Sequence, residues 1–252
     1  MDKTRFQQPE YSNTRRVPAL SPRLKKIADL VQEGAAIWDV GTDHGKLPVR
    51  LLLDGKVRYA IASDIKEGPL NSAKETAMNF GVEDRIEYRL CDGLGEEAPD
   101  GIDTVVIAGM GGETIINILK NAQWIIDKKV HLLMQPMSGI YKLRSFLYSN
   151  CYKIFSEHLV REKEKIYLCI DASGGGKSES FSFVDTRIGK YLVEGEPYRD
   201  YLVREKLRLK KEFNGADDGY RHIIQRAISD IESLIAGCLK RVDSLDKNNG
   251  GV

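Results

Sequence analysis

The residues with the clearest chemical potential in this sequence are carboxylates and glycines that come directly after short apolar segments. Four such positions follow four different segments: Gly41, Asp64, Asp92 and Gly109. Apolar strands that alternate with helices form a parallel sheet, and ligands bind at the carboxyl ends of its strands. The sequence therefore predicts one polar site that is assembled from these strand ends.

The stretch 35–48 (AAIWDVGTDHGKLP) carries the most specific pattern, which reads as a strand over 36–38, a tight loop over 42–45 and a helix over 46–53. Its spacing, acid-x-Gly-x-x-x-Gly from Asp39, differs from the G-x-G-x-x-G of dinucleotide sites. A carboxylate at this turn would repel a pyrophosphate and favours a ligand with a cationic amino-acid end, such as S-adenosylmethionine (SAM). An ordinary turn containing a glycine is the alternative interpretation of this stretch alone.

The other strand ends offer groups that suit the rest of such a ligand. An acid at the end of the second strand can accept hydrogen bonds from two ribose hydroxyls, although it can also simply cap a helix. A carboxylate after the third strand can accept a hydrogen bond from an adenine amino group. The predicted cofactor-binding residues are Asp39, Gly41, Asp43, His44, Asp64, Ile65, Asp92, Gly93, Ala108 and Gly109.

Composition bounds the class of protein. The chain has 252 residues, a net charge of +1, 42% hydrophobic and 30% charged residues, which is ordinary for a globular protein of one large domain or one plus a smaller one. It has no apolar run long enough to span a bilayer and no signal-peptide core near its start. Its four cysteines form no C-x-x-C pair and its four histidines are dispersed. We therefore predict a cytoplasmic protein without a metal site.

The chain divides into four segments by pattern. We predict a mobile arm over 1–16, an α/β domain over 17–172, a helical domain over 178–242 and a disordered tail over 243–252. Within the α/β domain, Ser21 should cap a helix that ends at Gly34. The run 173–177 (SGGGK) should be a flexible joint. Apolar residues spaced 4-3-4-3 beyond it predict an antiparallel coiled-coil hairpin.

Basic residues gather in two places despite the nearly neutral total charge. The predicted RNA-binding residues are Arg15, Arg16, Arg23, Lys25, Lys26, Arg204 and Arg208. A nearly neutral chain can bind nucleic acid only through local patches of this kind. For the hairpin, the solvated face of a coiled coil is the alternative interpretation.

Several motifs together resemble those of the bacterial tRNA (adenine-22 N1)-methyltransferases, the TrmK type. They are LSPRL (20–24), DVGTDHGKLP (39–48), ASDIKEGPL (62–70), CDGL (91–94), IAGMGG (107–112) and MQPM (134–137). The resemblance implies an α/β fold, with a Rossmann-like class I methyltransferase domain followed by a small helical coiled-coil domain. It also implies SAM as methyl donor, N1 of an adenine in the tRNA D-loop as acceptor, and no protein partner.

For that reaction adenine N1 is already a lone-pair nucleophile, so the site must mainly align it with the methyl group. Acceptors near the 6-amino group should help as positive charge develops on the base. The predicted catalytic residues are Gly109, Met110 and Gln135. We also expect Gly109 and Gly111 to leave no room for a side chain. Two alternatives remain: a SAM-dependent enzyme acting on a small molecule, and a non-catalytic RNA-binding scaffold.

Overall fold

The computed structural model describes residues 17–95, 97 and 99–249, with residues 239–249 as helix backbone only. Its strands are β1 (Ala35–Val40), β2 (Val57–Asp64), β3 (Ile86–Leu90), β4 (Thr104–Gly111), β5 (His131–Ser138), β6 (Tyr152–Glu162) and β7 (Lys165–Gly174). Its α-helices are α1 (Pro22–Leu30), α2 (Lys46–Leu53), α3 (Glu67–Phe80), α4 (Gly112–Lys120), α5 (Trp124–Asp127), α6 (Ile140–Ser149), α7 (Phe183–Ile188), α8 (Tyr198–Asn214) and α9 (Asp218–Asn249).

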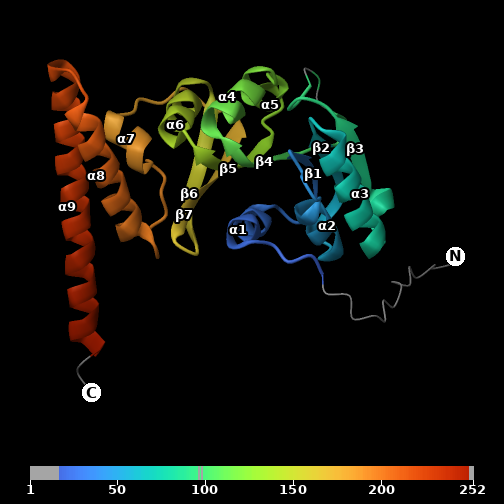
Figure 1. Ribbon diagram of the computed structural model, residues 1–252, viewed down its shortest axis with the longest axis horizontal. Coiled ribbons are helices and arrows are strands. Elements are labelled where there is room, and N and C mark those ends of the chain that lie inside the picture. Colours follow the sequence, from blue (N-terminus) through green and yellow to red (C-terminus); the bar gives the residue numbers. More distant parts are fainter. Residues whose placement is uncertain (1–16, 96, 98, 250–252) are drawn as a thin grey trace, which may run out of the picture.

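The strands form one seven-stranded sheet in the order β3-β2-β1-β4-β5-β7-β6. Strands β1 to β5 are parallel, whereas β7 pairs antiparallel with both β5 and β6. Helices cover both faces of the sheet. Successive residues of a strand point to opposite faces, so neighbours in β1 pack against different helices. Ile37 packs with α1, α2 and α3, whereas Trp38 packs with α4, α5 and α6. Figure 1 shows α1 and α2 across the strands from α4 and α6.

The order of the strands reverses between β1 and β4, which lie side by side at the centre of the sheet. In open α/β sheets the ligand crevice forms outside the carboxyl ends of the strands at such a switch point. Gly41 follows β1, and the backbone N–H groups of Gly41 and Thr42 both donate to Ser63 O, at 2.8 and 2.9 Å. The loop after β1 is thereby tied to the end of β2.

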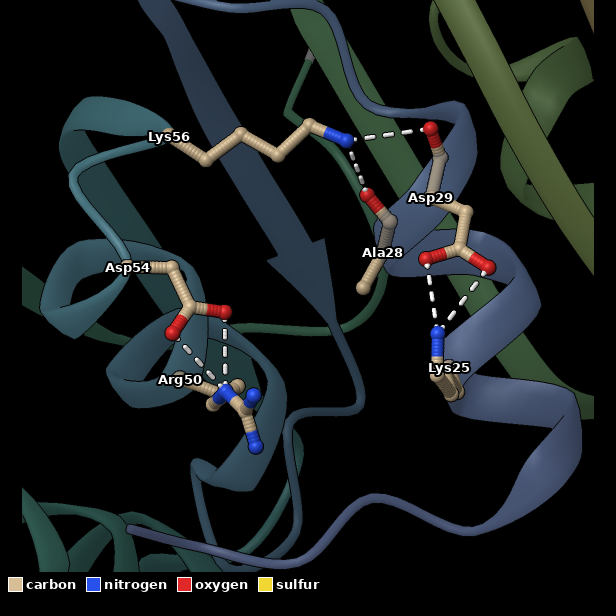
Figure 2. A network of polar contacts seen from close by, with 6 residues as sticks. All are labelled: Lys25, Ala28, Asp29, Arg50, Asp54 and Lys56. Carbon is tan, nitrogen blue, oxygen red and sulfur yellow. Dashed lines mark hydrogen bonds and ion pairs between the residues drawn. The ribbon is translucent and has the colours of Figure 1, made fainter.

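Helix α1 ends earlier than predicted, at Leu30 instead of Gly34. Lys56 lies between α2 and β2, and its Nζ donates to Ala28 O at 2.7 Å and to Asp29 O at 3.0 Å (Figure 2). These carbonyls at the helix end therefore find a partner from another part of the chain. Gly34 instead has a φ of +75° and donates its N–H to Lys56 O.

The glycine run predicted as a flexible joint is packed. Strand β7 includes Gly174, where an added Cβ would collide with the backbone oxygen of Ile125. The N–H of Gly176 donates to Cys151 O at 2.8 Å, and an added Cβ there would lie 2.7 Å from Lys153 N. The prediction was wrong because these glycines permit close backbone approach, not free rotation.

The helical part begins with α7, which was not predicted, and continues with α8 and α9, which lie side by side in opposite directions (Figure 1). Their buried seam includes Leu202, Leu209, Ile224, Ile228 and Ile231. The antiparallel hairpin is thus present, and its coiled-coil geometry stays a prediction. Helix α9 continues to Asn249 and so includes residues 243–249, and the predicted disordered tail stays a prediction.

A buried ion pair joins this helical part to the sheet. Arg144 on α6 donates through Nε to Glu157 Oε1 on β6 at 2.6 Å, and both side chains are fully buried. Its Nη1 also donates to Thr186 O, Arg187 O and Tyr201 Oη. The two parts therefore pack on each other, and the predicted domain boundary at 173–177 stays a prediction.

The predicted mobile arm, with Arg15 and Arg16, lies outside the described residues. Residues 250–252 of the predicted tail lie outside them as well. Within the part that the structure does describe, no helix combines the length and the apolar character needed to cross a membrane.

Candidate functional site

A cavity opens at the switch point, between the carboxyl ends of β1 and β4 and the first turns of α1 and α2. Its lining residues are Arg23, Leu24, Asp39, Gly41, Thr42, Asp43, His44, Lys46, Leu47, Ala108 and Gly109. Six residues of the predicted cofactor set are therefore brought together here. The other four lie at the ends of neighbouring strands: Asp64 is the last residue of β2, Ile65 follows it, and Asp92 and Gly93 come after β3.

Asp39 is the buried carboxylate of this cavity. Its side chain accepts a hydrogen bond from Thr42 Oγ1 at 2.7 Å, and the residue is 5% exposed. Burial raises the pKa of Asp39 to about 6; the Thr42 hydrogen bond opposes this shift and the charge of Asp64 adds to it. A buried carboxylate without a cation beside it is costly, so a cationic ligand in the cavity would stabilise its ionised form.

The loop after β1 depends on two positive-φ glycines. Gly41 has a φ of +71°, and Met110 Cε occupies the place where its Cβ would lie. Gly45 has a φ of +64°, and an added Cβ would lie 2.9 Å from the Cβ of Ala73. The glycines therefore allow the loop to turn and to contact both Met110 of β4 and Ala73 of α3.

The end of β2 presents a carboxylate beside an open apolar side chain. Asp64 Oδ1 accepts the backbone N–H of Lys66 at 3.0 Å, which fixes the orientation of the carboxylate. Ile65 is 62% exposed, so its side chain can cover the face of a bound purine. Cys91 N donates to Asp64 O at 3.1 Å and keeps the end of β3 next to the end of β2. Asp92, which follows, is exposed.

Gly93 is buried, and an added Cβ would lie 2.9 Å from the side chain of Ile118 on α4. Its φ of +71° also favours glycine. These two features give Gly93 a packing role in the loop after β3. The predicted contact of Gly93 with a cofactor stays a prediction.

The glycines of 108–112 have different constraints from those expected. An added Cβ at Gly109 would meet only Arg23 Nη1, at an ordinary 3.5 Å, and at Gly111 it would lie 3.3 Å from Ser138 Oγ. The expectation of no room was therefore wrong for Gly109, where the φ of +80° is the constraint. Gly112 is the crowded position, since a Cβ there would lie 2.6 Å from Gly139 O.

Arg23 was predicted on an RNA-binding surface, and the structure places it in the wall of the cavity. Its Nη1 donates to Gln135 Oε1 at 2.7 Å, and its guanidinium carbon lies 5.5 Å from the ring centroid of Tyr167. Its Nε lies 3.8 Å from Glu162 Oε2. One feature of the sequence indicates this position: Pro22 begins the helix, so Arg23 lies in its first turn.

Gln135 is fully buried beneath Arg23. Its Oε1 accepts the Arg23 hydrogen bond, and its Nε2 donates to Pro136 O at 3.0 Å. In this arrangement Arg23, and not Gln135, presents polar atoms to the cavity. Met110 contacts Gly41 through its side chain. The catalytic roles of Gly109, Met110 and Gln135 stay predictions.

Four further predicted RNA-binding cations lie among the described residues, two on α1 and two on α8. Lys25 is exposed on α1 and pairs with Asp29 at 3.2 Å (Figure 2). Lys26 is half-buried. The pKa of His158 is lowered mainly by burial and, to a smaller extent, by the charge of Lys26. Arg204 Nη2 donates to Glu164 O at 2.8 Å, whereas Arg208 forms an ion pair with Glu205, three residues earlier on α8. Across the described residues, no group of histidine, cysteine, aspartate and glutamate side chains could hold a metal ion.

Comparison with known proteins assigns this architecture to a class. Residues 20–170 match the model of a family described as a methyltransferase domain. A crystal structure of a protein in the NADB-Rossmann superfamily from Streptococcus agalactiae is 32% identical, with a TM-score of 0.73 over 86% of this chain and 97% of the other. The fold and the switch-point cavity thus define a Rossmann-like methyltransferase.

Two relatives narrow the assignment. The tRNA (adenine(22)-N(1))-methyltransferase of Bacillus subtilis (strain 168) is 32% identical over 74% of this chain and 76% of its own length. The structure of M. capricolum TrmK with S-adenosyl-homocysteine is 30% identical, with a TM-score of 0.72 over 86% of this chain and 98% of the other. The chain belongs to the tRNA (adenine(22)-N(1))-methyltransferase family, which confirms the resemblance of its motifs.

Proposed function

We propose that this protein transfers a methyl group from SAM to N1 of the adenine at position 22, in the D-loop of tRNA. The observation that carries the proposal is the buried Asp39 beneath the Gly41 loop, at the switch point of a chain that belongs to this family. SAM supplies an electrophilic methyl group on a positively charged sulfur. Because the substrate is a tRNA, we also infer that the protein works in the cytoplasm.

The chain offers a distinct group for each part of the cofactor. Asp39 and Asp43, which both line the cavity, place negative charge where the methionine end would bind. The carboxylate of Asp64 is oriented by Lys66 and would accept the ribose hydroxyls. Asp92 would accept the adenine amino group. The raised pKa of Asp39 supports this assignment, because a bound cation would stabilise its ionised form.

For the transfer itself, the protein must mainly align adenine N1 with the methyl group, because N1 carries a free lone pair and needs no strong base. Adenine N1 lies on the Watson–Crick edge, so the base must be unpaired and turned out of its stack to enter the site. Positioning of this kind can supply roughly 7–11 kcal/mol of the barrier. Gly109 faces the cavity without a side chain, and Arg23 bounds the space above it. The target base would therefore approach Gly109 from the side of Arg23, whose side chain would have to turn away from Gly109, since an added Cβ there would contact Nη1 at 3.5 Å.

The proposal is tested by incubating the protein with SAM and an unmodified tRNA, followed by nucleoside analysis by mass spectrometry. N1-methyladenosine is the expected product. N6-methyladenosine, or transfer to a small molecule but not to tRNA, would contradict the proposal. A protein that binds tRNA without binding SAM would be a non-catalytic scaffold.

The cofactor site is tested separately by Asp64→Ala, with Asp84→Ala as the control because Asp84 is exposed in the 3-10 turn before β3. Loss of two hydrogen bonds to the Asp64 charge should weaken SAM binding by roughly 2–4 kcal/mol. Calorimetry should show no change for the control. An unchanged SAM affinity in a folded Asp64→Ala protein would remove Asp64 from the site.

A further inference from the structure

A groove runs beside the switch-point cavity and belongs to none of the features described so far. Two adjoining cavities share Met137, Ile140 and Arg208 and together form it. Its sides are residues 136–141 between β5 and α6, residues 165–168 of β7, and the face of α8 that carries Arg204 and Arg208. We call it the α8 groove.

The α8 groove is continuous with the proposed active site. Met137 and Tyr167 line the groove, and both contact Arg23, which lines the switch-point cavity. Arg23 Nη1 lies 4.0 Å from Met137 Sδ, and the Arg23 guanidinium lies over the Tyr167 ring. Arg23 is therefore the boundary between the two spaces. An RNA strand with one nucleotide in the cavity would therefore continue into the groove.

The charge of the groove suits an anionic occupant. Its lining residues include four cations, Lys165, Arg187, Arg204 and Arg208, and one acid, Glu205. Glu205 is buried and pairs with Arg208, whose own side chain remains 63% exposed. Arg187 is buried and pairs with Glu212, so the accessible charge in the groove comes from Lys165, Arg204 and Arg208 and is positive.

Arg187 supplies a second, independent sign of a ligand. Its side chain is 6% exposed, with the guanidinium carbon 4.4 Å from the ring centroid of Tyr141 and 4.8 Å from that of Phe183. Nη2 donates to both carboxylate oxygens of Glu212, whereas the buried Nε has no partner. Buried donors are rarely left unpaired. Arg187 lines the groove next to the first turn of α6, whose N–H groups also suit an anion.

Apolar side chains complete the surface. Met137 is 45% exposed and Tyr141 is 40% exposed, although both are large and lie against arginines. Aromatic and apolar side chains interleaved with arginine are the composition that binds single-stranded RNA, because bases pack on the former and phosphates on the latter. A protein partner would not explain why this surface continues into the cavity that receives the target base.

We propose that the α8 groove binds the single-stranded nucleotides of the tRNA next to the target adenine. Their phosphates lie toward Arg204 and Arg208, and their bases lie against Met137 and Tyr141. This inference rests on the proposed function, because it places the RNA on either side of Arg23.

The test is the double variant Arg204→Gln/Arg208→Gln, compared with Arg226→Gln. Arg226 is also exposed but lies on α9, on the other side of α8 from the sheet (Figure 1). The double variant should raise the KM for tRNA at least tenfold, while kcat at saturating tRNA and the affinity for SAM stay within about twofold. Its log–log salt dependence of tRNA binding should be shallower by about 1.4, or about 0.7 per lost phosphate contact. The control should behave as the wild type.

Each outcome decides the proposal. If the wild type methylates tRNA and the double variant keeps its KM and salt dependence, the groove is not the RNA path and another occupant, such as an acidic protein, must explain it. If the wild type fails to methylate tRNA at all, the proposed function fails first. Arg204→Gln alone serves where the double variant is unstable, because Arg208 pairs with the buried Glu205 whereas Arg204 donates to the backbone oxygen of Glu164. Tyr141→Leu should raise the KM for tRNA, because it removes the ring against which a base would pack.

Discussion

Arg23 Nη1 donates a hydrogen bond of 2.7 Å to the fully buried Oε1 of Gln135. This bond ties the first turn of α1 to the end of β5, and it lies directly at the switch-point cavity. It joins a residue predicted on an RNA-binding surface to one predicted at the catalytic centre. The two predictions therefore meet in a single contact.

That contact can be measured by a double-mutant cycle. Arg23→Met leaves Gln135 Oε1 buried without its donor and should lower the free energy of unfolding by about 1–3 kcal/mol. Adding Gln135→Met, which has a similar volume, should recover part of that loss, because neither polar partner then remains. Denaturant titrations of the four proteins give the coupling energy. Strict additivity would mean that the hydrogen bond contributes nothing to stability.

The pKa of Asp39 predicts how SAM binding depends on pH. Burial keeps this carboxyl protonated below about pH 6, and only its ionised form attracts a cationic ligand. The affinity for SAM should therefore rise with pH through about 6 and then level off. The dissociation constant should be about tenfold larger at pH 5 than at pH 7.5. Calorimetry at several pH values measures this. Asp39→Asn should bind SAM weakly at every pH, and a pH dependence that persists in this variant would exclude Asp39 as its cause.

The glycines of β4 and α4 predict an order of stabilities. Gly109→Ala should cost about 1–3 kcal/mol, because alanine must adopt a φ of +80° there. Gly112→Ala should cost more, because its Cβ meets the backbone oxygen of Gly139 at 2.6 Å and no side chain can move aside. Thermal unfolding of both variants gives the order. Equal stabilities would show that the backbone around Gly112 relaxes freely.

We expect the buried Arg144–Glu157 ion pair to hold the helical part against the sheet. Arg144→Met leaves an unpaired carboxylate in a fully buried place and should destabilise the protein by about 3–5 kcal/mol. The double variant Arg144→Met/Glu157→Gln should be less destabilised than Arg144→Met alone, since no buried charge remains. Proteolysis of Arg144→Met should begin in the region of α7 and α8, which Arg144 contacts. Cleavage elsewhere first would argue against this role.

Much of the fold follows from local pattern. The helix predicted over 46–53 coincides with α2, and Gly81 closes α3 with a left-handed conformation as its sequence indicates. The buried strands appear where apolar residues run between turn residues, because both faces of the sheet are covered. Even α7, which was missed, begins with a capping box between Ser182 and Asp185 that its S-x-x-D spacing would have revealed.

What the sequence could not reveal depends on contacts between distant residues. Lys56 binds the carbonyl oxygens of Ala28 and Asp29 across 28 and 27 positions, and Ile125 packs against the glycine run that looked like a joint. The carboxylates and glycines of the site were predicted because strand ends in a parallel sheet share one edge. The contact of Arg23 with Gln135 was not predicted, because only tertiary packing turns the first turn of α1 toward Gln135.

Mapping the methyl group on a treated tRNA shows whether the protein methylates N1 of the adenine at position 22. After incubation with SAM, nuclease fragments of an unmodified tRNA are analysed by mass spectrometry, beside a tRNA in which the adenine at position 22 is replaced by guanine. We expect N1-methyladenosine in the fragment that contains position 22 and no methylation of the substituted tRNA. Equal methylation of both tRNAs, or a methyl group on a different nucleotide, would contradict it.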